Sequence, residues 1–261
     1  MAAPVSWSVV AQNLPEHARN PIHTDAGAQA AGFPRALVAG VTTYAYLTHP
    51  IVVAWGVEWL QRGGGEVRFR RPVFDHDLLR CTPSPDEDDG GDDAGAGAGA
   101  GVGAVTVHAI TDEPEQPRAA FRAVRRGGEP QPMRPGETLR STCVQLVGEM
   151  GSDYGSRAGD ELALFRHHGL VHPAVWPALA NHLVHTQVAR GSWIHTRSNI
   201  RHHATARAGS TAHVHATVVR RFQSHGERAV LDVHIEIDGV LVASREHEAI
   251  VLLPAAAPDR V

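Results

Sequence analysis

Alternating apolar and polar residues predict β-strands over several stretches of this chain. The clearest strands are expected near the C-terminal end, at 193–198, 213–219, 229–237 and 241–245. The dipeptide Asp238-Gly239 separates the last two stretches, and Asp-Gly between apolar runs is a strong hairpin signal. The pattern therefore predicts an antiparallel meander in this part of the chain.

Two longer stretches, Val41 to Gly56 and Pro173 to Ala189, are apolar on almost every helical face. A helix of this kind has to be buried, so each is expected to be wrapped by a sheet. Further strands are predicted at 5–10, 66–70, 105–110 and 141–146. The order strand, helix, meander thus occurs twice. We expect an α+β protein with a double hot-dog fold, in which two fused hot dogs each wrap one long helix in an antiparallel sheet.

Composition places a boundary near the middle of the chain. A Pro/Gly-rich linker at 126–138 predicts an N-terminal hot dog over residues 1–128 and a C-terminal one over 136–254. The acidic, Gly/Ala-rich segment 82–103 cannot bury apolar surface. We expect that segment to be a disordered loop that joins the predicted strands at 66–70 and 105–110 in one sheet.

Overall composition excludes several classes of protein. The chain has 261 residues, 43% apolar and 20% charged, with a formal net charge of −4, so a nucleic-acid partner has no electrostatic support. No signal-peptide pattern or long apolar run occurs, which predicts a cytoplasmic protein with no membrane partner. The two cysteines form no disulfide framework, and the 18 histidines lack metal-ligand spacing, so we expect no metal.

The most informative motif is Asn20-Pro21-Ile22-His23-Thr24-Asp25, followed by Gly32-Phe33 and then by Gly40-Val41. It resembles the hydratase motif of MaoC-like hydratases and dehydratases and of (R)-specific enoyl-CoA hydratases. In that family an Asp-x-Asn-Pro-x-His segment precedes a Gly-Phe turn and a glycine that begins the hot-dog helix. The resemblance covers residues 18–80. It implies a lyase that hydrates or dehydrates an enoyl or 3-hydroxyacyl thioester of coenzyme A or of an acyl carrier protein, with no cofactor.

The resemblance also assigns roles to individual residues. His23 would be the acid/base and Asn20 would support its loop. Gly40 and Val41 would donate N–H groups to the thioester oxygen at a helix N-terminus. Arg68 and Arg70 lie on the same side of a predicted strand. They could bind the phosphates of coenzyme A or of a carrier arm, or be ordinary surface residues.

One member of the motif is missing, because Ala18 stands where the family has aspartate. The chemistry could therefore have changed to a related elimination, isomerisation or cyclisation. His17, together with Glu16, could take the place of the missing acid, and Asp25 is a candidate helix cap or base. The alternative function is a non-catalytic acyl-binding hot dog or the inactive partner subunit of a hydratase complex. Monomer and homodimer both remain open.

A second resemblance concerns the helix of the second half. The segment 171–181 resembles the His-Pro-Ala-Leu-Leu-Asp segment of polyketide-synthase dehydratase domains, with Pro177 in the place of the catalytic aspartate. Asn181 and His185 follow at a spacing of four and share a helix face. Both are further candidates for the pocket.

Overall fold

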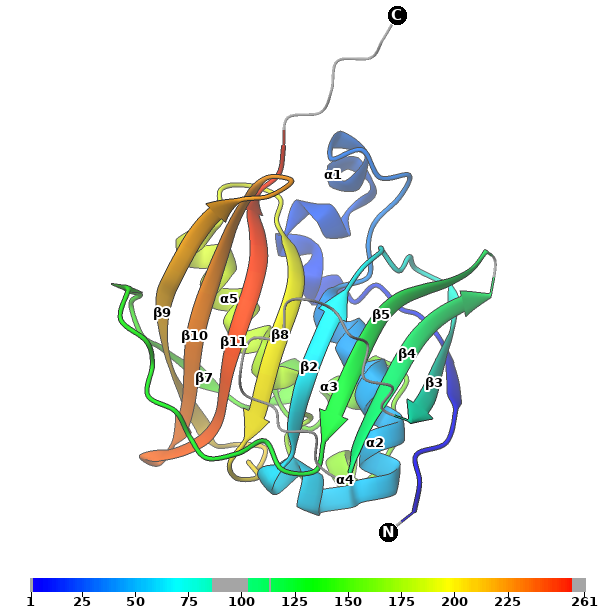
Figure 1. Ribbon diagram of the computed structural model, residues 1–261, viewed down its shortest axis with the longest axis vertical. Coiled ribbons are helices and arrows are strands. Elements are labelled where there is room, and N and C mark those ends of the chain that lie inside the picture. The colour runs from blue at the N-terminus through cyan, green and yellow to red at the C-terminus, as the bar shows by residue number, and fades with distance from the viewer. Residues whose placement is uncertain (1, 86–102, 113, 255–261) are drawn as a thin grey trace, which may run out of the picture.

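A single antiparallel sheet with helices on one face organises the protein (Figure 1). The computed structural model describes residues 2–85, 103–112 and 114–254. Within them eleven strands run in the order β1-β3-β4-β5-β2-β8-β11-β10-β9-β6, and β7 pairs with β9. The predicted α+β class and double hot-dog architecture are confirmed.

The first half contributes one end of the sheet and one long helix. Its elements are β1 (Trp7–Val10), η1 (Pro15–Arg19), η2 (Pro21–His23), α1 (Asp25–Ala30), α2 (Gly40–Arg62), β2 (Gly64–Phe69), β3 (Leu78–Pro85), β4 (Ala104–Asp112) and β5 (Glu115–Val124). Of these, η1 and η2 are 3₁₀ helices.

The second half repeats this order with more irregular connections. Its elements are β6 (Glu137–Thr138), β7 (Thr142–Gln145), η3 (Gly148–Met150), α3 (Tyr154–Arg157), α4 (Ala163–Arg166), α5 (Val175–Leu183), the π-helical turn η4 (Val184–Val188), β8 (Ile194–His202), β9 (Thr211–Gln223), β10 (Glu227–Ile237) and β11 (Val240–Leu252).

The two long helices are buried because the sheet curves around them. Fourteen residues of α2 are buried, from Val41 near its start to Leu60 near its end. Gly56 interrupts this helix with φ of 61°, a backbone conformation that glycine tolerates better than other residues. The predicted end of the helix at Gly56 therefore coincides with a real break, after which the chain resumes helical geometry to Arg62.

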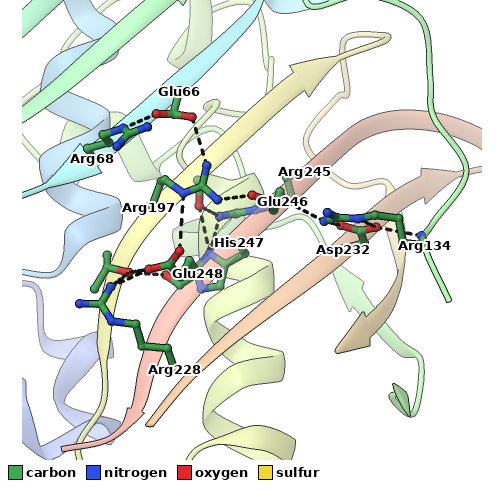
Figure 2. A network of polar contacts seen from close by, with 12 residues as sticks. Glu66, Arg68, Arg134, Arg197, Arg228, Asp232, Arg245, Glu246, His247 and Glu248 are labelled. Carbon is green, nitrogen blue, oxygen red and sulfur yellow. Dashed lines mark hydrogen bonds and ion pairs between the residues drawn. The ribbon is translucent and has the colours of Figure 1, made fainter. Parts of the chain in front are cut away.

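The halves meet at the antiparallel pairing of β2 with β8. On the outer face of this seam Arg197 of β8 forms ion pairs with Glu66 of β2 and with Glu246 and Glu248 of β11 (Figure 2). Arg134, which lies just before β6, extends the network through Asp232 and Glu246. Arg197 thus joins strands of both halves on the outer face of the sheet.

Three local predictions need correction. Thr82 to Pro85 are not loop residues, because they extend β3 and pair with Val105 to His108 of β4. Residues 86–102, the rest of the predicted loop, lie outside the described residues. The stretch 66–70 does not lead directly into this connection, since β3 intervenes. The second long helix is shorter than predicted, because regular α-helix ends at Leu183 and a π-helical turn follows.

Candidate functional site

A small cavity of about 60 Å³ lies where the two halves meet. The chain before α2 supplies part of its wall, and α2, η3, α3, α5, η4 and the chain before β8 supply the rest. It is lined by Glu16, His17, Arg19, Asn20, His23, Val41, Glu149, Met150, Tyr154, Ala178, Asn181, His182, His185 and Trp193. Seven of the residues predicted from the sequence are thus brought together here: Glu16, His17, Asn20, His23, Val41, Asn181 and His185.

One short segment presents five side chains to the cavity. It consists of two 3₁₀ helices, η1 and η2, that are separated by Asn20, whose backbone is extended. Glu16, His17 and Arg19 come from η1, Asn20 from the junction and His23 from η2. The change of direction at Asn20 lets both short helices contribute to one wall.

Local hydrogen bonds hold this segment in place. The Thr24 hydroxyl accepts a hydrogen bond from the Gly27 N–H at 3.2 Å and caps α1. The Asp25 carboxylate accepts the Ala36 N–H at 2.8 Å, so Asp25 supports the loop and does not line the cavity. A side chain at position 27 would collide with the Pro21 carbonyl, which explains the glycine there. The motif residues around His23 therefore serve mainly to fix the loop.

His23 is oriented by one hydrogen bond. Its Nδ1 lies 2.8 Å from the carbonyl oxygen of Leu37, so in the neutral ring Nδ1–H is the donor and Nε2 keeps its lone pair for the cavity. Burial lowers the pKa of His23 to about 4, although the bond to Leu37 acts in the opposite direction. At neutral pH His23 is an uncharged base.

A second histidine faces the first. The rings of His17 and His23 are 5.9 Å apart between centroids. His17 Nε2 lies 3.2 Å from the Thr42 hydroxyl and 3.4 Å from the Tyr154 hydroxyl, which are themselves 3.1 Å apart. Burial, followed by the nearby His23, Arg19 and Arg157, lowers the pKa of His17 to about 3. This triangle joins η1, α2 and α3 into a wall of neutral polar groups.

The second half contributes a further wall from α5 and the π-helical turn. Asn181 and His185 both line the cavity, as their spacing of four predicts for one helix face. The Asn181 Oδ1 atom is buried and has no hydrogen-bond partner within the described residues. His185 belongs to η4, and π-helical turns occur frequently at functional sites.

A carboxylate also reaches the cavity, although not from position 18. Glu16 lines it and forms an ion pair with Arg157 at 2.7 Å, while its other oxygen is buried without a partner within the described part of the chain. Ala18 is exposed and borders a wider open depression of about 610 Å³, which Glu16, Arg19, Glu149 and Arg157 also line. Position 18, where the MaoC-like motif has aspartate, therefore lies in the open depression beside the cavity and not in the cavity wall.

Other predicted residues lie outside the cavity wall. Gly40 begins α2, and a Cβ there would lie 3.3 Å from His195 Nδ1 and 3.4 Å from Phe69. Its N–H is one of the first amides of the helix, which no helical carbonyl can accept. Arg68 and Arg70 are exposed, Arg68 pairs with Glu66, and neither lines the cavity or the depression beside it.

In the described ranges no group of three or more histidines, cysteines or carboxylates could hold a metal ion. Nor does any helix described there reach the length and apolarity of a membrane span.

Two of the cavity residues that were missed from the sequence are aromatic. Tyr154 lies in a stretch without periodicity, so nothing in the pattern indicated it. Trp193 was assigned only to a predicted strand, yet it is 3% exposed and lines the cavity just before β8. A large aromatic residue at the start of a strand could have been noted as a candidate, but its partner Asn20 is 173 residues away in sequence.

Comparison with known proteins supports the fold. No protein-family model matches the sequence, and a comparison with curated proteins gives no match. A MaoC-like dehydratase matches at 12% identity over 96% of this chain and 98% of that one, with a TM-score of 0.61. A conserved protein from Mycobacterium tuberculosis, described as having a double hotdog fold, matches at 12% identity over 96% of both chains, also at 0.61. The dehydratase domain of PpsC from the same organism, solved with C12:1-CoA, matches at 13% identity over 95% of this chain and 93% of that one, at 0.53.

These matches define the class of protein. The chain has the double hot-dog fold found in MaoC-like dehydratases, and its cavity lies between the two hot dogs. At such low identity the likeness establishes the fold alone, so the activity has to be argued from the residues of the site.

Proposed function

We propose that the protein is a hydro-lyase that adds water to, or removes it from, an acyl thioester bound in this cavity, with His23 as the principal acid/base. The observation that carries the proposal is the state of His23: Nδ1 is fixed by the Leu37 carbonyl, and the ring is neutral at a cavity between the two hot dogs. Fold likeness to dehydratases, one of them solved with an acyl-CoA, supports the same class of ligand.

The reaction needs one group that takes a proton and one that returns it. In hydration, His23 Nε2 would accept a proton from water while the water oxygen bonds to carbon 3 of the enoyl thioester. The electron pair of the double bond then moves toward carbon 2 and the carbonyl oxygen, and carbon 2 receives a proton. The net change is the addition of one water molecule, and the reverse steps remove it.

His17 and Tyr154 are the groups best placed to assist. His17 lies beside His23, and Tyr154 lies beside His17. Both are neutral at pH 7, because burial lowers the pKa of His17 and raises that of Tyr154. A neutral group here becomes charged when it accepts or gives up a proton, so the proton that His23 takes from water would have to be returned to carbon 2 in the same step, by His23 itself or through this wall. The same groups could serve a related elimination, isomerisation or cyclisation of an acyl thioester.

The open depression beside the cavity has the chemistry to accept the rest of the thioester. Arg19 and Arg157 line it, and guanidinium groups bind phosphate well. Arg157 pairs with Glu16 and Glu149, so it would have to exchange these carboxylates for phosphate. We place the phosphates of coenzyme A, or of a carrier-protein arm, at these arginines instead of at Arg68 and Arg70.

The test is hydration of crotonyl-CoA and of longer enoyl-CoA thioesters by the wild type and by His23→Gln. Glutamine keeps a donor for the Leu37 carbonyl but cannot act as a base, so we expect a loss of about 100-fold or more in kcat. His167→Gln is the matched control, because His167 is exposed and lies outside the cavity. Equal rates for His23→Gln and wild type would contradict the proposal.

A second candidate is a non-catalytic protein that binds an acyl thioester. It is favoured by Ala18, which leaves the motif's aspartate position without an acid, and by the ion pair that engages Glu16. This alternative predicts tight binding of an acyl-CoA by calorimetry with no turnover of any enoyl-CoA in the panel.

A further inference from the structure

Trp193 brings a buried hydrogen-bond donor to the cavity wall. Trp193 lines the cavity, and its indole N–H is buried with no acceptor in the part of the chain that the structure describes. A buried donor without a partner is unfavourable, and a bound ligand with an acceptor oxygen would satisfy it.

Asn20 fixes the position of Trp193 by two hydrogen bonds. The Asn20 side-chain NH₂ group donates to the backbone carbonyl of Trp193 at 2.8 Å, and the Asn20 side-chain oxygen accepts the backbone N–H of Trp193 at 3.3 Å. Asn20 is 5% exposed, so water competes little for either bond. The loop that carries His23 and the segment that carries the indole ring are thereby held together, although they belong to different halves.

The donor character of Trp193 distinguishes it from its neighbours at the cavity. The other buried side-chain atoms without partners at this wall, Glu16 Oε1 and Asn181 Oδ1, are acceptors. Indole N–H is a donor only and does not release its proton at ordinary pH. Such a group suits an oxygen that gains negative charge without becoming protonated.

We propose that the Trp193 indole N–H donates a hydrogen bond to the carbonyl oxygen of the bound thioester, and that Asn20 is the positioning residue for it. This inference rests on the proposed function. Of the two donors expected from the motif, Gly40 does not line the cavity, and a Cβ there would face His195 and Phe69. Val41 does line it, so its N–H in the first turn of α2 could be a second donor. In this proposal one oxyanion donor comes from the second half of the chain, while the base comes from the first.

The experiment compares Trp193→Phe with Trp55→Phe. Trp55 is also buried, and its indole N–H likewise has no partner among the described residues, but Trp55 does not line the cavity. Both changes remove one N–H and the same ring atoms. The probe is the saturated acyl-CoA that the wild type binds best among C4, C8 and C12, labelled with ¹³C at the thioester carbonyl. Its infrared carbonyl band is recorded in each complex.

We expect the carbonyl band to lie at higher wavenumber in the Trp193→Phe complex than in the wild-type and Trp55→Phe complexes, because one hydrogen bond to the oxygen is lost. For an enoyl-CoA substrate kcat should fall about 100-fold in Trp193→Phe, with a much smaller change in KM. Asn20→Ala should shift the band in the same direction. Adding it to Trp193→Phe should cause no further shift, because it acts through the indole.

The outcomes separate the two proposals. If wild type binds a thioester but the band is the same in Trp193→Phe and Trp55→Phe, the role of Trp193 is overturned and the proposed function stands. If wild type binds none of the thioesters, both fall together.

Discussion

The residues between positions 16 and 23 that line the cavity do not follow one helical repeat. Two short 3₁₀ helices meet at Asn20, whose backbone is extended, and Ala18 is exposed although its neighbours His17 and Arg19 line the cavity. Sequence reasoning found the motif correctly, but it treated the chain before position 20 as strand or irregular, so it could not decide which of Glu16, His17 and Ala18 faces inward. Both Glu16 and His17 do.

The exposed position of Ala18 changes the effect on hydration rate that is expected when an aspartate is introduced there. From sequence alone, Ala18→Asp is expected to rebuild the acid/base pair and to raise hydratase activity. Because Ala18 borders the open depression and not the cavity, we expect no measurable gain in hydration rate from Ala18→Asp.

His17→Asn should reduce kcat by about 100-fold, since it removes a proton-transfer group beside His23. Steady-state hydration of an enoyl-CoA by the two variants checks this, and a gain in Ala18→Asp would show that the loop shifts when ligand binds.

At the scale of elements, helix and strand positions were predictable and their ends were not. The buried helix from Val41 and the hairpin at Asp238-Gly239 were correctly predicted, the latter with positive φ at both residues of the turn. The π-helical turn at Val184–Val188 could not be predicted, because it depends on packing against β11 and the sequence there is compatible with an ordinary helix. Thr82 to Pro85 were misjudged since two prolines in four residues favour a loop. Pairing with β4 prevails there.

A buried carboxylate links elements of the two halves. Asp160, which lies between α3 and α4, is 2% exposed, and its carboxylate oxygens lie 3.0 Å from His49 Nδ1 of α2 and 3.4 Å from His172 Nε2 before α5. His172 in turn stacks on Tyr154, whose hydroxyl contacts His17. The packing between the halves and the shape of the cavity therefore depend on each other.

At the scale of the whole molecule, the number of buried neutral histidines determines how stability responds to pH. Burial lowers the pKa of His202 to about 4 and shifts His195 and His247 well below the ordinary pKa of 6.5. Between about pH 6.5 and 4 the unfolded chain binds protons that the folded protein excludes. Stability is therefore greatest above pH 6.5 and is lost as the pH falls toward 4. Each such histidine changes the unfolding free energy by up to about 1.4 kcal/mol per pH unit in this window.

We expect the urea midpoint to fall steeply between pH 7 and pH 5. His202→Asn should reduce this slope by about one proton, because asparagine keeps a donor for the Trp59 carbonyl that His202 Nδ1 contacts at 3.1 Å and does not titrate. Equilibrium urea unfolding at several pH values measures both slopes. A wild-type midpoint that is constant or rises on acidification would contradict this account.

The pairing of the two halves was only partly accessible from sequence. The repeated order of elements predicts two hot dogs, but it does not reveal that β2 and β8 join them into one sheet or that Arg197 bridges the seam. The division into an N-terminal hot dog over residues 1–128 and a C-terminal one over 136–254 remains a prediction. The cavity itself could not be derived, because its walls come from segments more than 100 residues apart.

The central claim is that the cavity between the two halves holds the thioester group beside His23. A crystal structure of the protein with a saturated acyl-CoA tests it most directly. The account predicts the thioester carbonyl oxygen within hydrogen-bond distance of Trp193 Nε1, carbons 2 and 3 of the acyl group next to His23 Nε2, and the coenzyme A phosphates at Arg19 and Arg157. A thioester bound elsewhere, with the cavity occupied only by water, would contradict it.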